Sequence, residues 1–186
     1  MPPKTAATVL LERIAALMQQ SVRDDAARFG LLPMHIQVLA YLARANRYSD
    51  MPIAVAEYFG VTRGTVSQTL AVLERKGYVT KTADERHGKR VHLDLTPAGE
   101  AVLADTWVSR IDALLAGQPG LAQPLEAVLR ALLGGLQRLN GQQAFGVCRE
   151  CAYFKKTRQG GRCGLTGEGL DGPQTERLCR EWSAAA

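Results

Sequence analysis

The segment at residues 62–79, TRGTVSQTLAVLERKGYV, constrains the fold more than any other part of the chain. The hydroxyl of Thr62 is placed to cap a helix, because it can accept a hydrogen bond from a backbone N–H two or three residues on. Val66, Leu70 and Leu73 follow at helical spacing, which predicts a single apolar stripe. We therefore predict a capped amphipathic helix that packs on a core through this stripe.

On the first two turns of this helix, the opposite face carries short or flexible hydrogen-bonding side chains, with one cation and no carboxylate. Such side chains suit contact with phosphates and base edges, because they donate and accept hydrogen bonds without adding negative charge. We expect this face to contact DNA in the major groove. The candidate residues are Thr62, Arg63, Thr65, Ser67 and Gln68.

The residues before this helix predict a helix-turn-helix. One helix is expected over residues 33–45 and another over residues 54–59, each preceded or opened by a proline that suits a first helical position. Ala56 allows two helices to approach closely, and Gly60 suits the tight turn between them. A plain helical hairpin would look similar, but the Ala-x-x-x-Gly-x-Thr spacing favours the helix-turn-helix.

The residues after Gly77 predict a β-hairpin. Residues 78–82 favour a strand, and Val91, Leu93 and Leu95 alternate with polar residues as a second strand. The tip between them, ADERHGKR, could be an ordinary solvated turn; beside a presented helix it is better interpreted as a wing that reaches a phosphate or the minor groove. The candidate cations are Arg86, Lys89 and Arg90.

Apolar stripes lie on both sides of this small unit. A helix is predicted over residues 5–28, another over residues 97–116, a turn at residues 117–120, and a leucine-rich helix from Pro124 to a boundary at residues 140–141. The stripes could pack on the chain's own core. The unit is too small to cover all of them, so we expect a homodimer with a two-fold axis.

Composition narrows the class of protein. Hydrophobic residues make up 46% of the 186 residues, and the formal net charge of +5 is compatible with nucleic acid. We expect a cytoplasmic protein without a membrane segment, because the sequence has no signal-like or sufficiently long apolar run. No phosphate-binding loop, Gly-x-Ser-x-Gly or His-Glu-x-x-His occurs in the sequence, so an enzyme is not expected.

The sequence resembles the MarR family of winged-helix transcription factors over about residues 5–141, most specifically in VTRGTVSQTLAVLERKGYV and LTPAG. The family's wing usually reads Asp-x-Arg-Asp-x-Arg; Asp84 and Arg86 match its first half, while His87 and Lys89 replace the second Asp and Arg. Lys89 lacks the guanidinium fork for a bidentate contact. The resemblance implies that Arg86 enters the minor groove with Asp84 holding it. It also implies a homodimer that represses from a pseudo-palindromic operator on double-stranded DNA until a signal releases it.

The four cysteines, Cys148, Cys151, Cys163 and Cys179, all lie in the C-terminal tail. Their spacing, Cys-x2-Cys-x11-Cys-x15-Cys followed by Trp182, resembles the cluster-binding end of high-potential iron–sulfur proteins. A 4Fe–4S cluster accepts four cysteines at irregular spacing and suits a dry pocket screened by aromatic residues. Structural zinc is the alternative, although its second pair is more often a close couplet. Disulfides or free thiols remain a further alternative, disfavoured in a reducing compartment.

Together these features predict a mainly α fold with a small β wing: a winged helix-turn-helix with helical dimerisation elements (residues 1–141) and a small four-cysteine module (residues 142–186). We expect a DNA-binding regulator whose affinity is modulated by a 4Fe–4S cluster that senses redox state, oxygen, nitric oxide or iron. Whether the loaded form binds or releases DNA stays open at this point. The alternatives are a regulator with structural zinc and a small-molecule effector in the dimer cleft, and a redox or interaction module that docks protein.

Overall fold

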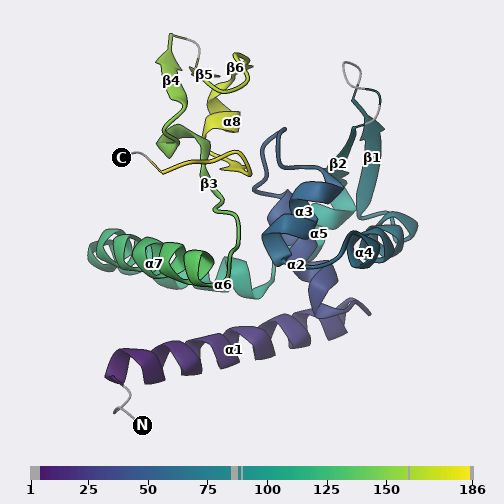
Figure 1. The fold of residues 1–186 in the computed structure, drawn as a ribbon. Helices are drawn as coiled ribbons and strands as arrows, with labels where there is room; N and C mark the ends of the chain where they lie inside the picture. The colour runs from purple at the N-terminus through teal and green to yellow at the C-terminus, as the bar shows by residue number, and fades with distance from the viewer. Residues whose placement is uncertain (1–4, 85–87, 89, 159, 185–186) are drawn as a thin grey trace.

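The computed structural model describes residues 5–84, 88, 90–158 and 160–184 (Figure 1). Its larger part is helical with one β-hairpin, as the sequence predicts. In chain order the elements of this part are α1 (Ala6–Arg28), α2 (Pro33–Leu42), α3 (Pro52–Phe59), α4 (Arg63–Arg75), β1 (Val79–Ala83), β2 (Val91–Leu95), α5 (Pro97–Leu103), α6 (Trp107–Ala116) and α7 (Pro119–Leu139).

The core of this part lies where α2, α3, α4 and α5 meet the base of the hairpin. Ile36, Leu39 and Tyr41 of α2 are fully buried there, and the α4 stripe packs against them. Between α3 and α4 the chain turns at Gly60, whose φ of 63° lies in the left-handed region, so the glycine predicted for this turn is confirmed. The predicted helix-turn-helix is therefore formed on a continuous apolar core.

The β1–β2 hairpin is antiparallel and projects away from the helices (Figure 1). Its register pairs Val79 with Leu95 at the base and Ala83 with Val91 toward the tip. Gly99, at the start of α5, lies directly under the carbonyl of Tyr78, where a Cβ would overlap that oxygen. This close approach explains why the LTPAG segment needs a glycine at this position.

The predicted helix over residues 97–116 is wrong in one respect, because the structure has two helices there. The chain leaves the helix after Leu103 and begins again at Trp107. The backbone N–H of Trp107 donates to Oδ2 of the buried Asp25 (2.7 Å), and the Thr106 hydroxyl donates to the Leu103 carbonyl (3.0 Å). A carboxylate of α1 thus stabilises the start of α6.

The predicted turn at residues 117–120 is also shorter than expected. The helix α7 already begins at Pro119 and runs through Pro124 to Leu139. Proline suits the first position of a helix, whereas Pro124 inside the helix removes one backbone hydrogen bond. The α7 helix is consequently a turn longer than predicted at its N-terminus.

Large apolar side chains remain exposed along α1 and along α6 and α7. In Figure 1, α1 crosses below the molecule, and α6 and α7 lie above its N-terminal half. None of the helices in the described ranges has the length and apolar character needed to cross a membrane. The exposed apolar residues of these three helices include Val9, Leu10, Ile14, Leu17, Leu114, Leu121, Val128, Leu129, Leu132, Leu133, Leu136 and Leu139.

The C-terminal part forms a small module of short elements. A three-stranded antiparallel sheet in the order β4-β5-β6 lies beside the β3–β7 pair, and both lie near the α2–α3 loop (Figure 1). Its elements are β3 (Gly146–Val147), the 3-10 helix η1 (Cys148–Glu150), β4 (Phe154–Thr157), β5 (Gly160–Cys163), β6 (Gly169–Leu170), α8 (Gly172–Thr175) and β7 (Leu178–Cys179).

Candidate nucleic-acid interface and cysteine centre

The helix α4 separates its two faces as predicted. Val66, Leu70 and Leu73 are buried with at most 1% of their surface exposed. The Thr62 hydroxyl accepts from the backbone N–H of Thr65 (3.2 Å), which confirms the predicted cap. All the predicted contact residues on the other face are exposed: Thr62, Arg63, Thr65, Ser67 and Gln68.

A groove runs between the start of α4 and the start of β2, on the side of the wing toward its tip. It has a volume of about 330 Å³, and its floor is formed by Met51, Pro52 and Ile53. Arg63 enters it from α4 and Arg90 from the wing. The structure thus brings together two of the predicted cations, whereas the predicted Arg86 and Lys89 lie outside the described residues.

A histidine between two carboxylates joins the wing to the α2–α3 loop. Nδ1 of His92 lies 2.6 Å from Asp50, and its Nε2 lies 3.4 Å from Asp84. Burial lowers the pKa of His92, but the hydrogen bond and charge of Asp50, together with Asp84, outweigh it and raise the pKa above its usual value. Burial also raises the pKa of Asp50, against the opposing effect of His92. The contact between the wing and the α2–α3 loop is therefore sensitive to protonation.

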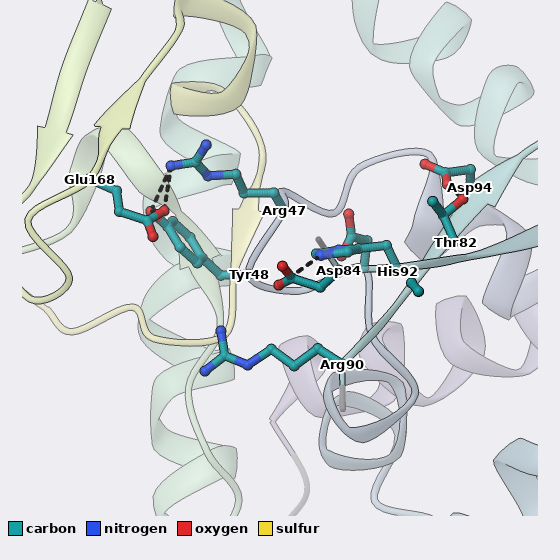
Figure 2. Close-up of a pocket in the computed structure, with 10 residues that line it drawn as sticks. Arg47, Tyr48, Thr82, Asp84, Arg90, His92, Asp94 and Glu168 are labelled. Atoms are coloured by element: carbon teal, nitrogen blue, oxygen red, sulfur yellow. Dashed lines mark hydrogen bonds and ion pairs between the residues drawn. The ribbon is translucent and has the colours of Figure 1, made fainter. Parts of the chain in front are cut away.

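The same residues line a polar cavity of about 490 Å³ between the wing and the C-terminal module (Figure 2). On the module side, Arg47 forms an ion pair with Glu168 (2.5 Å), and the Tyr48 hydroxyl donates to the same carboxylate (3.0 Å). His92 and Arg90 face the cavity from the wing. Residues of the C-terminal module and of the wing thus line the same cavity.

The four cysteines gather in the module as free thiols. Cys148 and Cys179 are buried and share an apolar cluster with Leu170, against which Cys163 also packs. Cys151 is half-buried and accepts a hydrogen bond from the backbone N–H of Ser183 (3.4 Å). The aromatic rings of Phe154 and Trp182 pack against the same cluster, whereas Tyr153 is 44% exposed and does not cover it.

Cys148 and Cys179 shift each other's pKa in opposite directions. The hydrogen bond from Cys148 to Cys179 raises the pKa of Cys148, with burial and the other cysteines adding to the effect. The same bond lowers the pKa of Cys179, further helped by the side chain of Asn46 and the backbone of Glu181, while burial opposes it. Of these two thiols, Cys179 is therefore the one more readily held as a thiolate, the form that binds metals.

In the described part of the chain, no group of three or more His, Cys, Asp or Glu side chains has the arrangement that holds a metal ion. The donor set is nevertheless suitable for iron–sulfur or zinc chemistry, because all four side chains are thiols and the other three interact electrostatically with Cys148. A backbone N–H donates to Cys151 and the Asn46 amide acts on Cys179, which are the outer contacts that stabilise thiolate ligands.

Asn46, in the loop between α2 and α3, connects the two parts of the chain. Its Oδ1 accepts from the backbone N–H of Tyr48 (3.0 Å) and from the hydroxyl of Ser49 (2.9 Å), which fixes the amide plane. Its Nδ2 is buried beside Cys179 and has no other partner among the described residues. The sequence does not show that Asn46 is buried, so its role between the two parts of the chain could not be predicted from the sequence.

Comparisons with known proteins identify the fold. Residues 29–90 match the model of the MarR family. This is the MarR winged-helix fold. A comparison with curated proteins found no match.

Several solved structures share this fold with the chain. The crystal structure of Staphylococcus aureus MepR in a DNA-binding conformation superposes with a TM-score of 0.60 at 24% identity, covering 72% of this chain and 100% of MepR. A MepR–DNA complex gives a TM-score of 0.54 at 24% identity with the same coverage. A transcriptional regulator from Thermotoga maritima gives 0.50 at 22% identity, covering 75% of this chain and 100% of that one. About a quarter of this chain thus has no counterpart in these structures.

Proposed function

We propose that this chain is a DNA-binding transcriptional regulator of the MarR type. The observation that carries the proposal is the α4 helix, which buries its apolar stripe and, over its first two turns, exposes a polar face without a carboxylate. Arg63 and Arg90 converge on the groove beside it, where two guanidinium groups suit a phosphate. The similarity in fold to MepR, one structure of which is a DNA complex, supports the same role.

The regulator is proposed to act as a homodimer on a pseudo-palindromic operator in double-stranded DNA. The support lies in the leucines of α7, of which Leu132, Leu136 and Leu139 are between 41% and 83% exposed in the single chain. A row of exposed large apolar side chains along one helix is typical of an interface between subunits. A two-fold axis would present two α4 helices to consecutive major grooves, so the operator would have matching half-sites.

The four-cysteine module is proposed to hold a 4Fe–4S cluster through Cys148, Cys151, Cys163 and Cys179. The support is the all-thiol donor set, the irregular spacing and the two aromatic rings on the apolar cluster. A cluster would give the module one-electron chemistry and sensitivity to oxygen or nitric oxide. The chain's residues would exclude water and donate hydrogen bonds to the sulfur atoms.

Structural zinc is a second candidate, favoured by the strong mutual influence of Cys148 and Cys179 on each other's pKa, which indicates that the two thiols lie close together. In a tetrahedral zinc site neighbouring sulfur atoms are only about 3.8 Å apart, given Zn–S bonds of about 2.3 Å. The signal would then be a small molecule rather than a redox change. An apolar groove of about 420 Å³ between α6 and α7, lined by Leu115, Leu125 and Leu129, is suited to such an effector.

DNA binding is tested by selecting duplexes from random sequence with the full-length protein and then measuring affinity over a range of salt concentrations. We expect a palindromic consensus and a log–log salt slope of several units, because each neutralised phosphate contributes about 0.9. Gln68→Ala should relax base preference at a cost of about 1–3 kcal/mol if it makes a good base contact. Selection that yields no consensus, together with salt-independent binding, would reject the proposal.

A further inference from the structure

The geometry points to a coupling within each subunit: the four-cysteine module holds the α2–α3 loop (residues 44–51) in its DNA-binding arrangement, with Arg180 and Asn46 as positioning residues. This inference rests on the proposed DNA-binding function and adds its regulation. The folded module is accordingly the state in which the loop is held for DNA binding. The evidence is a set of contacts between the module and the loop.

The backbone of the module pairs with the backbone of the loop through hydrogen bonds. The N–H of Leu178 donates to the Arg44 carbonyl (2.7 Å), and the N–H of Asn46 donates to the Leu178 carbonyl (2.9 Å). These bonds form a parallel bridge between Ala45 and Leu178, the residue that precedes Cys179. A rearrangement around Cys179 therefore acts directly on the backbone of the loop.

Arg180, on the other side of Cys179, reaches two elements of the helix-turn-helix. Its backbone N–H donates to the hydroxyl of Ser49 (2.8 Å), and its guanidinium donates to Oε1 of Glu57 on α3 (2.9 Å). The side chains of both partners of this ion pair are largely buried, with 19% and 27% of their surface exposed. Partial burial strengthens the pair relative to a surface salt bridge.

The loop in turn holds the elements that are proposed to contact DNA. The N–H of Leu93 donates to the Asp50 carbonyl (2.7 Å), and the carboxylate of Asp50 pairs with His92 (2.6 Å). The α3 helix starts directly after the loop and leads through Gly60 into α4. Displacement of the loop would move the wing and the α4 helix together.

The module could instead influence DNA binding through α7. In that case it would act on the proposed dimer interface and change the spacing of the two winged units. The module does contact α7, through an ion pair between Glu150 and Arg130 (2.7 Å). We favour the route through the loop because it combines backbone pairing, a buried amide and a partly buried ion pair around Cys179. The two routes predict different sensitive residues.

The experiment compares Arg180→Ala with Arg149→Ala and Arg130→Ala in the full-length protein, purified in the same metal state. Arg149 is the matched control, because it pairs with Glu176 inside the module. The readouts are the dissociation constant for the selected operator over a salt series and hydrogen exchange of residues 44–51 and 79–83. Thermal unfolding shows that each variant is folded.

We expect Arg180→Ala to weaken operator binding about fivefold to tenfold, within the usual range of coupling between sites. The salt slope should be unchanged and exchange in the loop and wing should be faster, because Arg180 positions the loop and contacts no phosphate. Arg180→Lys should restore part of the affinity, since it retains the charge beside Glu57. Arg149→Ala and Arg130→Ala should bind as the parent does.

Other outcomes overturn the coupling. Parental affinity of a folded Arg180→Ala would do so, as would a salt slope lowered by about 0.9, which indicates a direct phosphate contact. A loss of affinity in Arg130→Ala alone would favour the route through the dimer. If the parent itself shows no salt-dependent binding, the proposed function fails instead, so the two failures are distinguishable.

Discussion

Replacement of Gly161 by alanine tests whether the aromatic cover of the cysteines is as tightly packed as the structure shows. Gly161 is buried in β5, and the ring of Phe154 lies directly on it. A Cβ at this position would lie 2.7 Å from Cζ of the ring and closer still to its edge. Either the ring or the strand must therefore move, and with it the packing around Cys163.

The magnitude follows from the cost of overpacking, about 1–3 kcal/mol for added atoms in a well-packed core. A module of about 45 residues buries little apolar surface and has little stability to lose. The matched control is Gly169→Ala in the neighbouring strand, where nothing lies within 4 Å of the new Cβ. An exposed substitution of this kind should change the free energy of unfolding by less than about 0.5 kcal/mol.

The assay is denaturant unfolding of the module followed by the fluorescence of Trp182. The sequence contains two tryptophans, so the comparison is made in a Trp107→Phe background. That change is tolerable because Nε1 of Trp107 is buried without a hydrogen-bond partner among the described residues. If Gly161→Ala and Gly169→Ala unfold at the same denaturant concentration, the packing argument is wrong.

Three further predictions concern the dimer, the DNA contact and the wing. Leu132→Asp should give a monomer or insoluble protein in light scattering, because a charge would enter a dry interface, whereas a monomeric parent would refute the dimer. Arg63→Ala should lower the salt slope of operator binding by about 0.9, and an unchanged slope would remove Arg63 from the interface. The raised pKa of His92 means that its stabilising contribution is fully present below pH 6.5 and is lost as pH rises through the folded-state pKa. The difference in unfolding free energy between the parent and His92→Gln should therefore shrink with rising pH, and a constant difference would contradict this.

Local interactions made the helix-turn-helix predictable. The Thr62 cap, the apolar spacing of α4 and the glycine at position 60 each act within a few residues, so the sequence shows them directly. The exposed face of α4 follows from the same periodicity. The prediction for the wing strands succeeded for a similar reason, since alternation of polar and apolar residues is also local.

Contacts between distant residues explain what the sequence did not reveal. The break before α6 depends on the buried carboxylate of Asp25, which lies more than eighty residues earlier in the chain. The docking of the module depends on Asn46 and Arg180, ordinary polar residues whose roles appear only when β7 is placed beside the loop. Cysteine spacing predicted a common centre, but spacing alone carries no information on which surface the centre would touch.

The most direct test of the link between the cysteines and DNA is the affinity of one preparation for its operator before and after the metal centre is removed. The protein is purified without oxygen, and iron, sulfide and zinc are measured per chain before the titration. We predict stoichiometric iron and sulfide, and operator binding that weakens at least about tenfold when the centre is lost, within the usual range of allosteric coupling. Equal affinity of the loaded and stripped protein at the same salt concentration would contradict control of DNA binding by the four cysteines.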